Sequence, residues 1–137
     1  MGGGERTWDR WRRVLVGGLL MVTLTGSPAT AEMQLLPGAA ADLDQAIVDE
    51  VLATFRQAEQ ALRAGDVDGI MALYSEQYNY HGLKKTDMRK VWTNLFDEFR
   101  ELSDTHHFSR MIRVGSGSKT IIEVTCTGSL SGLSKTG

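Results

Sequence analysis

Residues 65–82 read GDVDGIMALYSEQYNYHG, and this stretch decides the expected fold. A glycine followed directly by an aspartate suits the end of one helix and the start of another, because Gly favours the left-handed C-cap and Asp the N-cap. Val67, Ile70 and Leu73 then recur at helical spacing. Residues 78–81 alternate Tyr, Asn, Tyr and His before a glycine, which predicts a brief extended segment. The stretch therefore predicts two helices that meet at a sharp break, with a strand after the second helix.

The segment before this break predicts a long amphipathic helix. Asp42 is the expected N-cap, with Gln45 as its capping-box partner, and Gly65 is the expected C-cap. The apolar positions that recur at helical spacing are Leu43, Ile47, Val48, Val51, Leu52, Phe55, Ala58 and Leu62.

The segment after the break predicts a third helix, capped by Thr86 or Asp87. Its apolar stripe is too rich in aromatic residues to be left in water. The stripe consists of Met88, Val91, Trp92, Leu95, Phe96, Phe99 and Leu102.

Two strands are expected at residues 105–114 and 119–127, joined by a turn at residues 115–118 (GSGS). Mixed polar and apolar residues occupy both faces of this hairpin, as expected where a sheet lines a cavity. A four-residue turn sets the expected pairs as Val114 with Lys119, Ile112 with Ile121, Met111 with Ile122, Arg110 with Glu123, Ser109 with Val124 and His107 with Cys126.

The first 31 residues have the order of a secretory signal peptide. Four arginines precede an apolar run at residues 14–24, and an Ala-Thr-Ala triplet at residues 29–31 resembles a cleavage site. The apolar run is shorter than the roughly 20 residues that span a bilayer. Arg12 and Arg13 also fit a twin-arginine signal, although the general secretory route is favoured. Cleavage after Ala31 and a periplasmic or secreted location are expected, with no stable membrane anchor afterwards.

The remaining 106 residues carry 11 Lys and Arg against 15 Asp and Glu. A mildly acidic domain without a basic cluster argues against nucleic acid as a partner. The single cysteine, Cys126, excludes an intramolecular disulfide and zinc-type cysteine spacing. We therefore expect no metal and no cofactor.

Residues 61–80 (ALRAGDVDGIMALYSEQYNY), with Phe55 and the aromatic third helix, resemble the nuclear transport factor 2-like superfamily, especially its SnoaL-like exported members. The resemblance implies an α+β fold, in which three N-terminal helices pack on a cone-like curved antiparallel sheet and enclose an apolar pocket. It covers residues 42–128, after a linker at residues 32–41. Members normally add further long strands, whereas residues 129–137 predict a flexible tail. The fold is therefore expected to be incomplete or completed by a partner, with an exposed edge and a homodimer formed through the sheet.

The resemblance also implies where chemistry would lie, because enzymes of the superfamily use a Tyr hydroxyl with an Asp or His base in the pocket. The candidate catalytic residues are Tyr80 and His107, with Tyr74 and His81 as further possibilities. Asp66 and Asp68 are better explained as a helix cap and a first-turn carboxylate. The residues expected to line the pocket are Phe55, Tyr74, Tyr78, Trp92, Phe96, Met111 and Cys126.

The neighbouring His106 and His107 do not predict a metal site, because adjacent strand residues point to opposite faces of a sheet. His107 opposite Cys126 is the minimal arrangement for a thiol nucleophile, although a single cysteine on an apolar face is more often a small core residue.

Three functions follow from these observations. The first is an exported module whose pocket binds a small hydrophobic or amphipathic ligand, or a protein partner, without a convergent catalytic set. The second is an isomerase or lyase that uses Tyr and His in the pocket. The third is an incomplete domain without activity.

Overall fold

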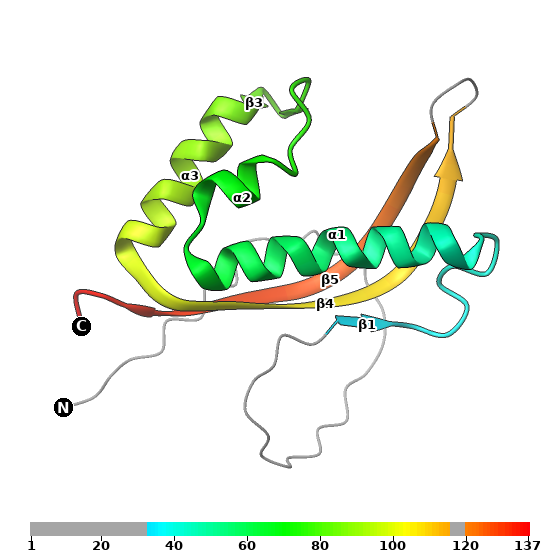
Figure 1. Cartoon of the computed structure of the whole chain (residues 1–137), viewed down its shortest axis with the longest axis horizontal. Coiled ribbons are helices and arrows are strands. Elements are labelled where there is room, and N and C mark those ends of the chain that lie inside the picture. Colours follow the sequence, from blue (N-terminus) through cyan, green and yellow to red (C-terminus); the bar gives the residue numbers. More distant parts are fainter. Residues whose placement is uncertain (1–32, 116–119) are drawn as a thin grey trace, which may run out of the picture.

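The computed structural model of the chain describes residues 33–115 and 120–137. The expected α+β class is confirmed: helices pack on one face of a curved, open sheet (Figure 1). The signal peptide predicted at residues 1–31 lies outside the described residues. The elements are β1 (Met33–Leu35), α1 (Gln45–Ala64), α2 (Val67–Met71), β2 (Asn79–Tyr80), β3 (Leu83–Lys84), α3 (Lys85–Glu98), β4 (Phe99–Val114) and β5 (Ile121–Ser134).

The main sheet has the strand order β1-β4-β5. β4 and β5 form a long antiparallel hairpin, and β1 runs parallel to β4 with Met33 beside His106. Within the linker expected at residues 32–41, Met33–Leu35 form a strand of the main sheet. Turns follow β1, and the Met111 amide donates to the Ala39 carbonyl at 2.7 Å, which ties this segment to β4.

The flexible tail predicted at residues 129–137 is wrong for its larger part, because β5 continues to Ser134. That residue pairs with Phe99 at the start of β4. Two glycines allow this close pairing: a Cβ on Gly132 would lie 2.5 Å from the Leu102 side chain, and one on Gly128 would lie 2.0 Å from the Thr105 carbonyl oxygen. Backbone pairing and small side chains therefore make a strand from a segment that has little β propensity.

The predicted hairpin register is also wrong. Val114 pairs with Ile121 rather than Lys119, so a longer connection than four residues joins the strands. Residues 116–118 of the predicted turn and residue 119 of the predicted strand lie outside the described part. A bulge between Phe108 and Arg110 then shifts the pairing by one residue. The observed pairs that replace the predicted ones are Ile112 with Glu123, Met111 with Val124, Arg110 with Thr125 and His107 with Thr127.

The break between α1 and α2 has the predicted chemistry. Gly65 has φ 65° and its amide donates to the Ala61 and Leu62 carbonyls. Asp66 caps α2 by accepting a hydrogen bond from the Gly69 amide at 2.9 Å. Asp42, by contrast, is not the N-cap of α1, because turns occupy residues 37–42 and the helix begins at Gln45 after Asp44.

The extended segment after α2 does not begin the main sheet. Asn79 and Tyr80 pair only with Lys84 and Leu83, in a separate two-stranded hairpin. His81 and Gly82 form its turn with φ 51° and 86°, the positive values that a type I′ turn requires. His81 is therefore a turn residue.

α3 begins earlier and ends earlier than the sequence predicts. Its N-cap is Lys84, whose amide donates to the Asp87 carboxylate at 2.9 Å. The helix ends at Glu98, because Phe99 already pairs with β5, and Leu102 reaches the core from β4 instead of from the helix. Lys135, just beyond β5, donates from its amide to the Glu98 carbonyl and from its ammonium to the Phe96 carbonyl.

The core consists of two separate clusters of buried side chains. The first lies where α1, α2 and β4 meet and contains Ala61, Leu62, Ile70 and Leu102. The second lies under the N-terminal half of α1 and contains Val48, Phe108 and Met111. α1 and β4 contribute to both clusters, so they form the common frame of the domain.

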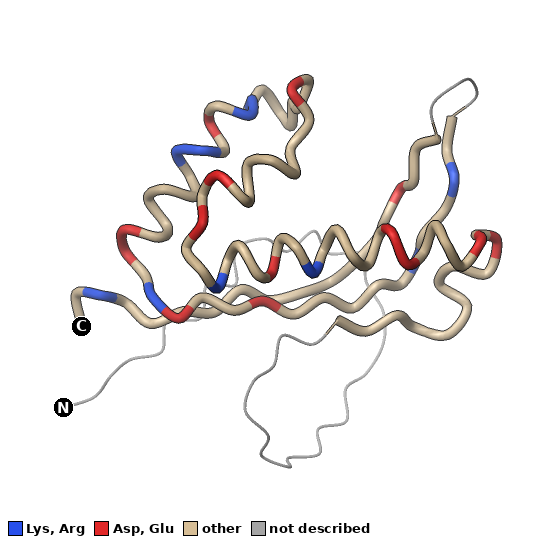
Figure 2. Tube along the Cα trace, in the orientation of Figure 1, with Lys and Arg blue, Asp and Glu red and all other residues tan. Residues whose placement is uncertain are grey.

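Acidic and basic residues are interspersed along α1 and α3, as the colours of the backbone trace in Figure 2 show. Arg63 pairs with Glu59 within α1 at 3.0 Å, and Arg89 of α3 pairs with Asp68 of α2 at 2.8 Å. Asp68 therefore has a structural partner. None of the helices in the described ranges combines the length and hydropathy that crossing a bilayer requires.

Candidate functional site

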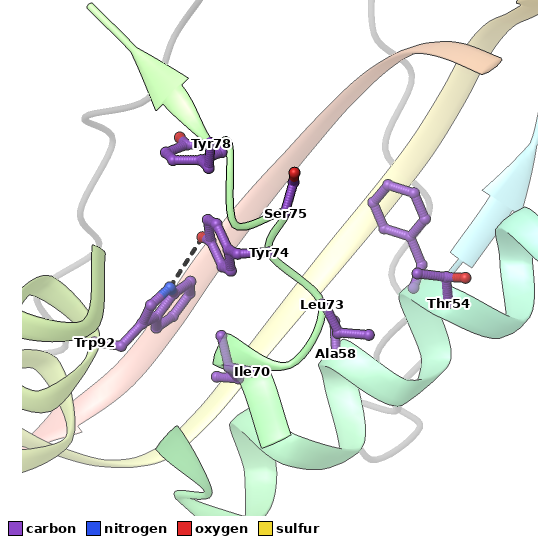
Figure 3. A pocket seen from close by; sticks show the side chains of 9 residues that line it. Thr54, Ala58, Ile70, Leu73, Tyr74, Ser75, Tyr78 and Trp92 are labelled. Atoms are coloured by element: carbon purple, nitrogen blue, oxygen red, sulfur yellow. Dashed lines mark hydrogen bonds between the residues drawn. The ribbon is translucent and has the colours of Figure 1, made fainter. Parts of the chain in front are cut away.

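A hollow of about 380 Å³ lies between α1, α2, the connection to β2, and α3. Its walls are almost entirely apolar and it is partly open to solvent. Figure 3 shows side chains from these different elements around the same space. The nine lining residues are Thr54, Phe55, Ala58, Ile70, Leu73, Tyr74, Ser75, Tyr78 and Trp92.

Tyr74 is the polar group with the most defined setting in this hollow. The Trp92 indole donates to the Tyr74 hydroxyl oxygen at 3.0 Å, and the Tyr78 ring meets the Tyr74 ring edge-on at 4.9 Å (Figure 3). Burial raises the pKa of Tyr74, against the opposing effect of the Trp92 hydrogen bond. The phenol therefore stays protonated at neutral pH. Since its oxygen accepts from Trp92, its own proton can be donated to a bound molecule.

Four of the residues predicted to line a pocket surround this hollow, namely Phe55, Tyr74, Tyr78 and Trp92. The other three lie elsewhere. Phe96 packs on the first core cluster, and Met111 is buried in the second. Cys126 is exposed on β5.

The structure does not bring Tyr80 and His107 together. His107 lies between His106 and Phe108, whose rings both contact Phe55 on the helix side of the sheet. Because side chains alternate along a strand, the exposed His107 points to the opposite face. Tyr80 lies in the β2–β3 hairpin beside the His81 ring, at a centroid distance of 4.3 Å.

A second group of polar side chains lies on the helix side of β4 and β5. The Asp104 carboxylate and the His106 Nε2 atom are 2.7 Å apart, and Cys126 of β5 is the diagonal neighbour of His106 on the same face. The hydrogen bond to Asp104, with the interaction with Cys126 second, raises the pKa of His106 to about 9, although burial acts in the other direction. The predicted pairing of Cys126 with His107 is therefore replaced by a contact with His106.

The His106 ring contacts two aromatic rings, which also contact each other. Phe55 meets it edge-on at 5.1 Å, and Phe108 stacks on it at 5.9 Å with an interplanar angle of 14°. Since Phe55 also lines the hollow, its ring separates the hollow from the group formed by Asp104, His106 and Cys126.

Sequence reasoning missed Asp104 and His106 as a pair. The signal was their spacing of two residues in a strand, which places both side chains on one face. Within the described ranges, no group of three His, Cys, Asp or Glu side chains is placed to hold a metal ion.

Comparisons with known proteins give one distant structural likeness. No protein-family model matches the chain. No curated protein matches it either. A crystal structure of a candidate aromatic ring hydroxylase from Novosphingobium aromaticivorans resembles it with a TM-score of 0.43 and 16% sequence identity. The match covers 64% of this chain and 65% of that protein, so the chain corresponds to less than two thirds of its length.

Proposed function

We propose that the protein binds a small, uncharged, ring-containing molecule in the hollow between α1, α2 and α3. The observation that carries this proposal is an apolar space with aromatic walls and one oriented hydroxyl, that of Tyr74. Its volume of about 380 Å³ falls within the range of roughly 300–1,000 Å³ that is usual for ligand pockets.

The walls define the chemistry of the ligand. None of the nine lining residues is charged, so an ionic ligand would lose its hydration without gaining a partner there. Trp92, Tyr78 and Phe55 offer ring faces and edges for a flat apolar body. The Tyr74 hydroxyl supplies one donor, which matches a carbonyl or ether oxygen on the ligand.

The proposal includes two further features. One is export to the periplasm or the medium, supported by the arginines, the apolar run and the Ala-Thr-Ala triplet of residues 1–31. The other is membership of the nuclear transport factor 2-like superfamily, supported by the order of two helices, a Gly-Asp break, a third helix and a long hairpin. Amino-terminal sequencing of the protein recovered outside the cytoplasm tests the first.

Titration with 1-indanone tests the binding site, because this flat, neutral ketone offers one carbonyl to Tyr74. Indane, the same ring system without the oxygen, is the matched ligand. Binding is measured by isothermal calorimetry on the full chain and by fluorescence of a Trp8→Phe/Trp11→Phe variant, which leaves Trp92 as the single tryptophan. Tyr74→Phe is expected to weaken indanone binding by about 2- to 13-fold, the equivalent of one hydrogen bond, and to leave indane binding nearly unchanged.

Filling the hollow provides the decisive control. Ala58 lines it, whereas Ala53 on the same helix is exposed. Ala58→Phe should abolish binding and Ala53→Phe should retain it. Equal binding by these two variants, or no binding of either compound to the wild-type protein at millimolar concentration, would refute the proposed site.

A further inference from the structure

Three side chains of the β4–β5 hairpin form a connected row on the helix side of the sheet. β5 runs opposite β4 with Gly128 beside His106 and Cys126 beside Phe108, so Cys126 is the diagonal neighbour of His106. Asp104 lies two residues before His106 on the same face. The row therefore runs from Asp104 through His106 to Cys126.

The imidazole lies between a carboxylate and a thiol. Its Nε2 atom is 2.7 Å from Asp104, and its Nδ1 side faces β5, 3.5 Å from the point where a side chain on Gly128 would begin. Cys126 is the next side chain along that face of β5, beside the ring. Because Gly128 has no side chain, the His106 ring can lie close to the backbone of β5 at this position.

The side chains become more exposed from Asp104 to Cys126, and a reactive thiol must be accessible to its reaction partner. The side chains of Asp104 and His106 are 14% and 23% exposed, while Cys126 is an exposed free cysteine. One Asp104 oxygen, Oδ1, is buried without a hydrogen-bond partner among the described residues. The charge of this carboxylate is therefore compensated mainly by His106, which favours the protonated ring.

We propose that Cys126 is a nucleophile activated by His106, with Asp104 as a positioning residue, and that it adds to α,β-unsaturated carbonyl compounds. A carboxylate that orients an imidazole beside a thiol is the arrangement that activates cysteine in proteins. The imidazolium stabilises the thiolate and also holds the proton that the addition product requires.

The step balances without another reactant. The thiolate sulfur forms a bond to the alkene carbon β to the carbonyl, and the π electrons move to give an enolate. The His106 imidazolium then transfers its proton to the enolate, which leaves a saturated thioether and a neutral imidazole.

This class of electrophile suits the surroundings better than a disulfide. Cys126 is the only cysteine in the chain, so a mixed disulfide could not be passed to a second thiol of the same molecule. On the same face of β5, Cys126 has the apolar Val124 on one side and Gly128, with the His106 ring close to it, on the other, so a neutral compound would reach the exposed thiol past Val124.

The rate of alkylation of the full-length protein, followed by mass spectrometry, tests the proposal. Acrylamide needs both a thiolate and a proton, whereas iodoacetamide releases iodide and needs only a thiolate. At pH 6 the folded protein should react with acrylamide about tenfold or more faster than the same chain unfolded in urea, because an ordinary thiol is almost entirely protonated there. A folded chain that reacts no faster than the unfolded one would overturn the proposal without any variant.

Variants then separate activation from structure. His106→Gln should slow acrylamide by about tenfold or more and slow iodoacetamide less, because only acrylamide needs the proton. Asp104→Asn should change the ratio of the two rates in the same direction, which a merely structural role would not do. His107→Gln, on the opposite face, and Ala53→Phe, at an exposed position of α1, should leave both rates within about twofold of wild type. An unchanged ratio of rates in folded His106→Gln and Asp104→Asn proteins would refute the assigned roles.

Discussion

The His106 imidazolium should make the stability of this protein depend on alkaline pH. The Asp104 carboxylate, and then Cys126, raise the pKa of His106 from 6.5 to about 9 in the folded chain. A raised pKa means that the folded state binds the proton more tightly than the unfolded state. Its stabilising contribution is therefore complete below about pH 6.5 and is lost as pH rises through about 9.

The size of the effect follows from the same shift. Each pH unit between the two pKa values corresponds to about 1.4 kcal/mol, which gives an upper limit of about 3.5 kcal/mol. Partial exposure of the pair screens it, and we expect about 1–2 kcal/mol in practice. For a domain of about 100 residues, this corresponds to a decrease in Tm of about 4–16 °C between pH 6 and pH 10.

Urea unfolding at a series of pH values, followed by far-ultraviolet circular dichroism, measures this contribution. His106→Gln should remove it, and Asp104→Asn should remove more of it than Cys126→Ser, because the carboxylate is the larger cause of the shift. From α1, the group that contacts His106 is the uncharged Phe55 ring. His107→Gln is the matched control and should retain the wild-type dependence. A His106→Gln protein that loses stability between pH 6.5 and 9 as steeply as wild type would refute the reasoning.

Three further predictions concern stability and are checked by chemical unfolding. Gly128→Ala should destabilise by at least about 2 kcal/mol, because the new Cβ would lie 2.0 Å from the Thr105 carbonyl oxygen and separate β4 from β5. Phe108→Ala should cost about 3–5 kcal/mol, because the fully buried ring leaves a cavity. Asp66→Ala should cost about 1 kcal/mol and Asp44→Ala almost nothing, since only Asp66 makes a side-chain cap; equal losses would contradict this assignment.

The parts of the fold that local chemistry determines could be predicted from the sequence. Gly65 and Asp66 end one helix and start the next through hydrogen bonds within a few residues, so their signals are complete in the local sequence. The helical apolar pattern before Gly65 likewise needs no distant partner. These predictions rest on interactions that do not depend on tertiary structure.

The boundary between α3 and β4 could not be predicted in this way. Phe99 and Leu102 continue the apolar spacing of α3, and that spacing is compatible with a longer helix. The pairing of Phe99 with Ser134 ends the helix at Glu98, because it holds the backbone of Phe99 in an extended conformation. No local feature of the sequence contains this distant contact.

The sequence predicted part of the hollow but not the polar group on β4 and β5. The aromatic residues around the hollow belong to helices and their connections, where local spacing indicates a shared face, although Phe96 on the same stripe packs on the first core cluster instead. The group formed by Asp104, His106 and Cys126 depends on strand register, and the bulge after Phe108 changes that register by one residue. A one-residue error exchanges the two faces of a strand, which is why His107 was chosen in place of His106.

The division of the core into two clusters has a consequence for how occupancy of the hollow would affect the whole molecule. Ile70 and Trp92 of the hollow belong to the first cluster or pack on it, whereas Phe55 packs on the second. A molecule in the hollow would touch both and link them. We therefore expect amide hydrogen exchange of the α2–α3 region to occur by local opening in the empty protein and to approach the global unfolding limit when the hollow is filled.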